Sequence, residues 1–236
     1  MLKLATKFAP DPVAFEMAHR AGFRHAELFL DNRILADWQT VCQHARNYSN
    51  SYALHFPNQL DLAPESLESA VSLYRMLGSS CLIIHQPMFE KYRDALARLA
   101  PDLQFAIENH KLTIDEFFDW AEQSPGLALD VEHLWKFTLA DGPLQDLLDE
   151  LTGFLTHFGQ KLRHVHMPGY WPGFQEHRPM YCSRDMVFPV LSLLAQAGFK
   201  GLVVSEADRQ FQNPHELRMD VLLFEAWREA SNGSLN

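Results

Sequence analysis

The sequence predicts an α/β protein built as a single (β/α)8 TIM barrel domain that spans residues 1–236. Strand-like and helix-like segments alternate along the whole chain, as they do in parallel α/β folds. Eight such pairs average about thirty residues each, which is the size of one βα unit with its loops. Neither G-x-G-x-x-G nor G-x-x-x-x-G-K-[ST] follows the first strand-like run, which disfavours a doubly wound sheet.

The expected elements follow one another in regular order. Strands are expected at 2–8, 23–30, 51–56, 80–85, 105–109, 126–130, 161–167 and 201–206. Helices are expected at 11–22, 36–48, 63–78, 89–100, 113–123, 143–159, 186–199 and 213–230. The first helix has a capping residue at Asp11, proline at its first position and Gly22 at its end, and Gly78 ends the third helix. A long loop, 166–185, precedes the seventh helix.

Composition limits the partners. The net charge of −10 repels a phosphate backbone, so nucleic acid is an unlikely partner and a small molecule is the expected one. Cys42, Cys81 and Cys182 are odd in number and lack a C-x-x-C motif, which favours a reducing compartment. No apolar run approaches the ~20 residues that span a bilayer, and MLKLATKFAP lacks a signal-peptide core. We therefore expect a cytoplasmic protein without a membrane segment, and a homo-oligomer remains open.

Six of the strand-like runs end on a side chain that binds metals or moves protons. A buried strand favours apolar residues, and a carboxylate or imidazole at its end loses hydration unless something pairs with it. In a closed parallel barrel all the carboxyl ends of the strands open onto one face, where active sites lie. The six residues are His55, His85, Glu108, Asp130, His166 and Glu206.

The last four strands carry the core of the expected site, which is Glu108, Asp130, His166 and Glu206. Three carboxylates facing one another repel strongly in a poorly solvated pocket unless a divalent cation neutralises them. Oxygen ligands with one imidazole suit Mn²⁺, Mg²⁺ or Co²⁺, and Zn²⁺ is favoured as imidazoles are added. The alternative is a set of salt-bridged strand ends, which requires Lys or Arg partners, and few are visible.

A second set of residues is expected either to bind metal or to hydrogen-bond substrate hydroxyls, namely His55, His85, His133 and His177. His133 follows Asp130 by three residues, so both side chains can reach one site from a strand end and its turn. In contrast, His164 is expected to point away from His166, toward the helices. On the second strand, Glu27 is the residue placed to reach the mouth.

These residues lie in short motifs, which are L-H-F-P at His55, I-I-H-Q-P at His85, I-E-N at Glu108, L-D-V-E-H at Asp130 and His133, H-V-H at His166, and S-E-A at Glu206. As a set they resemble the xylose isomerase-like barrel superfamily over nearly the whole chain. That superfamily includes ketose epimerases, hydroxypyruvate isomerases, inosose and dehydroshikimate dehydratases, and apurinic endonucleases. The resemblance implies one divalent metal held by Glu108, Asp130, His166 and Glu206.

The endonuclease branch of this superfamily uses three zinc ions, and the resemblance extends to most of its additional ligands, at His55, His85, His133 and His177. One position departs from that branch, since Gln175 stands where its members have an aspartate ligand of the third zinc. The loop after His177 reads MYCSRD, whereas members often have a glycine-rich segment there.

The function expected first is a divalent-metal-dependent isomerase or epimerase of a small sugar or hydroxy-carbonyl compound, acting through an enediolate. Glu108 and Glu206 are the residues expected to move the proton. The alternatives are a multi-zinc phosphodiesterase of the apurinic endonuclease type, a dehydratase that uses the same enolate chemistry, and a non-catalytic sugar-binding barrel. An anionic group of the substrate would meet Lys7, Arg178 or Arg209 from the loops.

Overall fold

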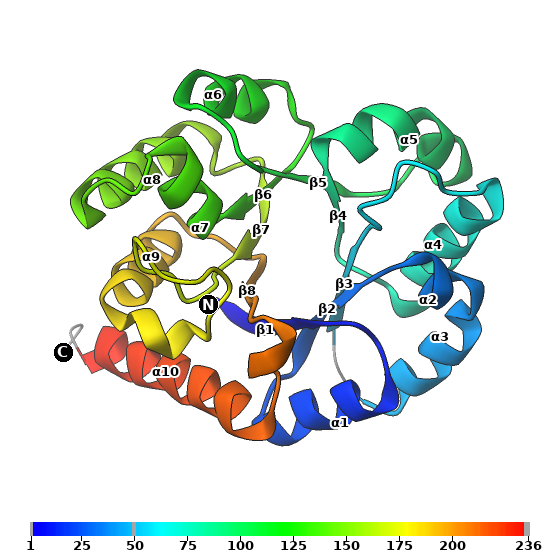
Figure 1. Ribbon diagram of the computed structural model, residues 1–236, viewed down its shortest axis with the longest axis horizontal. Coiled ribbons are helices and arrows are strands. Elements are labelled where there is room, and N and C mark those ends of the chain that lie inside the picture. Colours follow the sequence, from blue (N-terminus) through cyan, green and yellow to red (C-terminus); the bar gives the residue numbers. More distant parts are fainter. Residues whose placement is uncertain (1, 49–50, 234–236) are drawn as a thin grey trace.

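Eight parallel strands close into a barrel in the computed structural model, which describes residues 2–48 and 51–233 (Figure 1). Each strand pairs with its neighbour in the sequence, and the first pairs with the last. The strands are Lys3–Phe8 (β1), His25–Phe29 (β2), Ser51–His55 (β3), Leu82–His85 (β4), Phe105–Glu108 (β5), Leu127–Asp130 (β6), Leu162–His166 (β7) and Leu202–Ser205 (β8). The predicted (β/α)8 fold class is therefore confirmed.

Helices surround the strands on the outside of the barrel (Figure 1). They are Pro12–Ala21 (α1), Asn32–Ala36 (α2), Trp38–Arg46 (α3), Pro64–Leu77 (α4), Gln86–Leu99 (α5), Ile114–Gln123 (α6), Val131–His133 (α7), Leu144–Phe158 (α8), Arg184–Gln196 (α9) and Pro214–Gly233 (α10). The Asp11 carboxylate caps α1, and Gly22 and Gly78 end α1 and α4 in the left-handed conformation, as predicted. None of the helices described is long and apolar enough to cross a membrane.

Two short elements after β6 were not predicted from the sequence. The helix α7 leads directly into a π-helical turn at Leu134–Thr138 (η1), so the chain turns sharply at the end of β6. Most of the first residues of this segment are buried, including Glu132 and His133. The turn therefore holds polar side chains at the mouth of the barrel, where a helix leading straight away from it would not.

A layer of apolar side chains, four of them alanine, fills the barrel below its mouth. The inward-facing residues of this layer are Ala5, Ala53, Cys81, Ile83, Ala106, Ala128, Leu202 and Val204. Barrel interiors are usually filled by bulky branched residues. Because four strands place alanine here, the layer leaves room for the large polar side chains of Glu27 and His164, which are 0% exposed.

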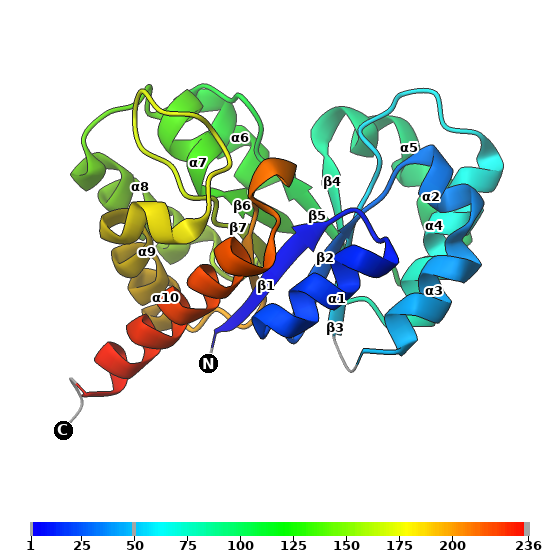
Figure 2. The same ribbon diagram turned by 60° about the horizontal axis from the view of Figure 1, so that its bottom comes forward.

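The loop after β7 folds back over the mouth and stands above the barrel in Figure 2. Gly169 and Arg178 form an antiparallel bridge, and a Cβ atom on Gly169 would lie 1.9 Å from the carbonyl oxygen of Pro179. Further along, Tyr181 donates its backbone N–H to the buried carboxylate of Asp220 on α10 at 3.0 Å. These contacts fix a path that returns His177 to the mouth.

Candidate metal centre

Each of the eight strands has a polar or charged side chain inside the mouth, at its last residue, one or two residues before it or, for Glu206, one residue after it. Side chains alternate along a strand, so a residue two positions beyond an inward-facing alanine also faces inward. Lys7, His55, Glu108 and Asp130 stand in this relation to the four alanines of the interior layer. The complete set is Lys7, Glu27, His55, His85, Glu108, Asp130, His166 and Glu206.

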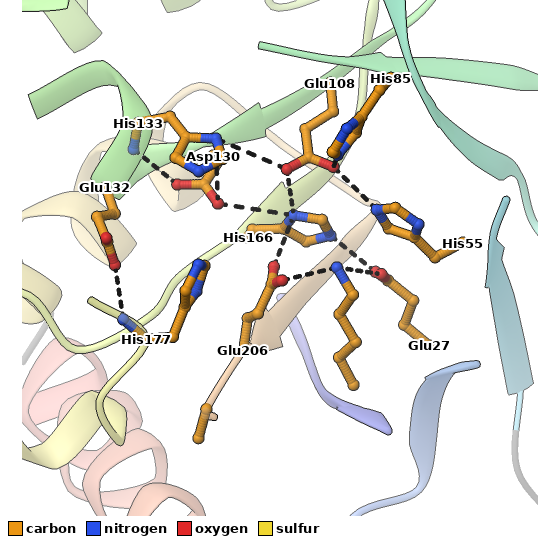
Figure 3. A network of polar contacts seen from close by, with 12 residues as sticks. Glu27, His55, His85, Glu108, Asp130, Glu132, His133, His166, His177 and Glu206 are labelled. Carbon is orange, nitrogen blue, oxygen red and sulfur yellow. Dashed lines mark hydrogen bonds and ion pairs between the residues drawn. The ribbon is translucent and has the colours of Figure 1, made fainter. Parts of the chain in front are cut away.

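The structure brings together the four residues predicted as the core of the site. One ligand atom each from Glu108, Asp130, His166 and Glu206 lies within 4.8 Å of the other three, and we refer to these residues as the central quartet. Nδ1 of His166 lies 2.8 Å from Oε2 of Glu206, 3.3 Å from Oε1 of Glu108 and 3.8 Å from Oδ2 of Asp130 (Figure 3). Three carboxylate oxygens thus lie near Nδ1 of the His166 imidazole.

Glu27 fixes the orientation of the His166 ring. Its Oε2 atom lies 2.9 Å from Nε2 of His166, which is 0% exposed, so that nitrogen donates its proton to the carboxylate. A carboxylate behind a metal-binding histidine commonly fixes the tautomer in this way. The lone pair on Nδ1 of the neutral ring then faces the three carboxylates of the central quartet.

Three atoms of the central quartet are buried without a hydrogen-bond partner in the described part of the chain. They are Nδ1 of His166, Oδ2 of Asp130 and Oε2 of Glu206. The 2.8 Å contact between His166 and Glu206 therefore lacks hydrogen-bond geometry. Buried polar atoms are normally paired, and each unpaired one costs about 1–3 kcal/mol. A divalent cation would satisfy all three atoms together, so the residues present fit a metal.

A second group of ligands meets the quartet at Glu108. His55 donates its Nδ1 proton to the carbonyl oxygen of Phe56 at 3.0 Å, and burial lowers its pKa, so the ring is neutral. Its Nε2 lone pair then faces Oε2 of Glu108 at 3.0 Å, and Nε2 of His85 lies 3.1 Å from the same oxygen. Ligands of a tetrahedral zinc are separated by about 3.3 Å, given bonds of about 2.0–2.1 Å. Glu108 therefore belongs to both groups of candidate ligands, the central quartet and the group with His55 and His85.

The other two histidines of the predicted second set, His133 and His177, do not contact Oε2 of Glu108 as His55 and His85 do. His133 donates from Nδ1 to the carbonyl oxygen of Asn109 at 2.8 Å, and its backbone N–H donates to Asp130 at 2.8 Å. It therefore packs beside the central quartet. His177 lies farther out, where its backbone N–H donates to the carboxylate of Glu132 at 3.0 Å. The rings of the two histidines are 6.2 Å apart.

The charges in the mouth depend on one another. Burial raises the pKa of the Glu108 and Glu206 carboxyls, but the neighbouring cations together outweigh it, His166 with His85 at Glu108 and His166 with Lys7 at Glu206, so the pKa of both carboxyls lies below its ordinary range. Burial also lowers the pKa of His166, yet the carboxylates of Glu206, Glu27 and Glu108 raise it well above the ordinary value. Without a metal, His166 is therefore an imidazolium. At Asp130, burial dominates and raises the pKa.

Lys7 pairs with two carboxylates at once. Its Nζ atom lies 2.7 Å from Oε1 of Glu206 and 3.4 Å from Oε1 of Glu27. Although burial opposes the charge, Glu206 and Glu27 raise its pKa above the ordinary value, so the ammonium persists at neutral pH. Within residues 2–48 and 51–233, Lys7 is the only lysine or arginine paired with the inward carboxylates. One ammonium is too little to make the cluster an ordinary set of salt-bridged strand ends.

The prediction for His164 is wrong. Residues two apart on a strand point to the same side, so His164 faces the interior together with His166 and does not face the helices. Its Nε2 atom contacts Oε2 of Glu27, and both side chains are 0% exposed. His164 therefore supports the carboxylate that orients His166.

Several residues of the centre were not assigned to it from the sequence. Lys7 was expected only to contact an anionic group of the substrate. Asn109 was not expected at all, and its side-chain amide pairs with the backbone N–H and C=O of Asp130. It also missed His110, whose ring stacks on His85 at 5.2 Å and whose pKa burial lowers to about 4. The alternation of side chains along β1 and β2 would have placed Lys7 and Glu27 inside the barrel, because each residue is followed by an apolar residue that faces the other side.

The centre opens into two adjoining cavities. The smaller one has a volume of about 300 Å³ and is lined by residues of the centre, including Glu108 and His55. The larger one has a volume of about 940 Å³ and continues past the N-terminus of α1. Four residues line both cavities, namely Lys7, Phe29, His177 and Glu206. Small-molecule sites are typically ~300–1,000 Å³.

No protein-family model matches the sequence, and no curated protein does. A D-tagatose 3-epimerase-like protein is structurally similar, with a TM-score of 0.69, 15% identity and coverage of 100% of both chains. Endonuclease IV from Thermus thermophilus has a TM-score of 0.62 at 15% identity, covering 97% of this chain and 99% of its own. D-allulose 3-epimerase from Methylomonas sp. has a TM-score of 0.61 at 16% identity, covering 96% and 98%. The protein therefore shares the closed (β/α)8 barrel fold of these structures.

We predict that Glu27→Gln weakens divalent-metal binding by about 10–100-fold, the usual effect of removing a group that orients a ligand. Asp130→Ala removes a ligand itself and should abolish binding at the central quartet. Metal titration of both variants, with Glu229→Gln on the exposed face of α10 as the control, tests this. Unchanged affinity in Asp130→Ala would show that the quartet is not the metal site.

We also predict that metal affinity rises with pH. Because the carboxylates hold the pKa of His166 above its ordinary value, a metal that binds Nδ1 must displace a proton. Below the pKa of His166, the apparent affinity should fall about tenfold for each pH unit. Calorimetric titration in buffers of different ionisation enthalpy measures the proton released. An affinity that is constant between about pH 6 and 8, with no proton released, contradicts the prediction.

Proposed function

We propose that the protein is a divalent-metal-dependent isomerase or epimerase of a small sugar or hydroxy-carbonyl compound. One observation carries the proposal, which is that the central quartet holds three unpaired buried atoms and that two of its residues, Glu108 and Glu206, line a cavity of about 300 Å³. A cavity of this size holds a small molecule against the quartet. The sugar epimerases among proteins of similar fold support the same class of reaction.

The metal's part in such a reaction would be to acidify the C–H bond beside a carbonyl and to stabilise the resulting enediolate. Glu108, Asp130, His166 and Glu206 would hold it. Glu27 keeps His166 in the tautomer that presents Nδ1 to the cavity side of the quartet. The same carboxylate contacts His164 from below, so the histidine ligand cannot easily rotate.

Glu108 and Glu206 are the proposed proton carriers. They come from β5 and the end of β8, three strands apart around the mouth, and both line the smaller cavity. A substrate between them meets one carboxylate on each side, which epimerisation requires. Lys7 donates a hydrogen bond to Oε1 of Glu206, so together with His166 it keeps this carboxylate ionised.

A multi-metal phosphodiesterase is the second candidate function. One observation favours it, since His55 and His85 both converge on Oε2 of Glu108 and so form a second metal-binding group beside the quartet. Two positions weaken it. The side chain of Gln175 replaces a charged ligand of the endonuclease type and turns to Asp208 at 3.3 Å. The net charge of −10 also opposes association with DNA.

We predict that Glu108→Gln and Glu206→Gln slow proton exchange by at least about 100-fold at saturating metal, the usual contribution of a positioned general base. Candidate ketoses are incubated in D₂O with each variant, and deuterium beside the carbonyl is followed by NMR. Glu229→Gln serves as the control for the same chemical change on the surface. If both variants exchange the proton as fast as the wild type, neither glutamate is the base and the assignment moves to the histidines.

Cleavage of an abasic-site duplex separates the two candidate functions. We predict no metal-dependent incision above background at micromolar or lower protein, because the acidic surface disfavours the phosphate backbone. The assay should include low salt, where any electrostatic binding is strongest. Efficient incision that Asp130→Ala abolishes would establish the phosphodiesterase instead.

A further inference from the structure

The smaller cavity has an ammonium in its wall that the metal centre does not use. Lys111 belongs to the loop after β5 and lines this cavity together with Phe137 and Glu176, and we refer to these three residues as the outer wall. We propose that Lys111 binds an anionic group of the substrate, either a carboxylate or a phosphate. The substrate is then an anionic hydroxy-carbonyl compound, a sugar acid or a sugar phosphate, and in this respect the inference rests on the proposed function.

The backbone of Lys111 is held in an unusual conformation. Its φ angle is 53°, a left-handed value that side-chain-bearing residues rarely adopt. The turn after β6 fixes the chain on both sides of it. Nδ1 of His133 donates to the carbonyl oxygen of Asn109 at 2.8 Å, and Oγ1 of Thr138 donates to that of Leu112 at 3.0 Å. Strain that the surrounding contacts maintain in this way concentrates at ligand-binding and active sites.

The π-helical turn η1 also places the side chain of Lys111. Its Nζ atom lies 5.6 Å from the centre of the Phe137 ring, which belongs to η1. An ammonium is attracted to the face of an aromatic ring, but the ring does not neutralise it. The ammonium keeps three donor protons for an acceptor in the cavity. Phe137 therefore holds the charge at the cavity wall and leaves it available to a ligand.

The charges of the outer wall favour an anion. Its single carboxylate, Glu176, already pairs with Lys136, whose Nζ atom lies 5.4 Å from the centre of the same Phe137 ring. In contrast, Lys111 has no carboxylate within ion-pair distance among residues 2–48 and 51–233. The outer wall is therefore left with a net positive charge. Since Glu108 and Glu206 of the central quartet line the same cavity, its two ends differ in charge.

The other cations near the mouth are less suited to this role. Lys7 already pairs with two carboxylates. Arg178 lines a separate cavity of about 250 Å³, and Arg209 lines the larger cavity of about 940 Å³. Of the lysines and arginines in the described part of the chain that line the smaller cavity, Lys111 is the one without a carboxylate partner. A substrate whose hydroxy-carbonyl group lies at the central quartet would thus meet Lys111 with its other end.

The test measures the affinity of the Mn²⁺-loaded protein for three related probes by calorimetric titration. D-fructose is neutral, whereas D-fructose 6-phosphate and 5-keto-D-gluconate carry a phosphate and a carboxylate at the end away from the hydroxy-ketone. We expect the wild type to bind at least one anionic probe about tenfold or more tightly than D-fructose, which is the usual effect of a hydrogen bond to a charged group. The preferred probe identifies the anion as a phosphate or a carboxylate.

Variants of Lys111 assign the preference to this residue. Lys111→Met should lower the affinity for the preferred anionic probe about tenfold or more, to that for D-fructose, and Lys111→Arg should retain the preference. Lys200→Met, the same change at an exposed lysine before β8, is the control, and Mn²⁺ titration shows whether each variant keeps its central quartet. Equal affinity of the wild type for all three probes, or a preference that survives in Lys111→Met, would overturn the proposal.

Deuterium exchange of the same probes in D₂O tests the proposed function separately. If no probe takes up deuterium beside its carbonyl while the anionic preference depends on Lys111, the assigned reaction is wrong and the anion site stands. Exchange that Glu108→Gln abolishes, without any preference for an anionic probe, would support the proposed function and contradict the anion site.

Discussion

Mutual repulsion of carboxylates inside a closed barrel is the constraint on which the rest of the site depends. Glu27, Glu108, Asp130 and Glu206 are largely or wholly withdrawn from water and face one another. In such surroundings like charges cannot all remain ionised without compensation. The protein itself supplies one ammonium, from Lys7, and a protonated His166. These cations hold the metal-free protein together, and His166 must give up its proton when a divalent ion replaces it.

The alanine layer makes this arrangement sterically possible. Glu27 lies opposite Ala53 in the register of β2 and β3, and His164 lies opposite Ala128 in that of β6 and β7. Two large polar side chains therefore lie beside alanines, so the interior accommodates them together with its bulkier apolar residues. Larger residues at these alanines would displace Glu27 and release His166 from its orientation. The packing of the barrel interior therefore determines the orientation of the candidate metal ligand His166.

The sequence allowed the fold and most of the centre to be predicted, because both follow from local periodicity. The eight strands were recognised, and six strand ends supplied residues that the structure brings together at the mouth. Lys7 and Glu27 were harder to place because Phe8 and Leu28 follow them, so their strands do not end on a polar residue. A side chain faces the mouth because of its place in the alternation along the strand, and not because it ends the strand. By the same alternation His164 faces the interior with His166, so its expected orientation toward the helices was wrong. The placement of Lys111 depends on contacts between the loop after β5 and the turn after β6, which no local pattern reveals.

The same fold occurs in sugar epimerases and in an endonuclease, so the function must be argued from the side chains at the mouth. Lys7 is the most informative of these for the chemistry. Its ammonium pairs with both Glu27, which orients His166, and Glu206, which is a proposed metal ligand and a proposed base. A change of charge on Glu206 during proton transfer is therefore felt by Glu27 and, through it, by His166. Because both carboxylates raise the pKa of Lys7, the ammonium persists and offsets negative charge on either carboxylate, which lowers the cost of charge in a poorly solvated site.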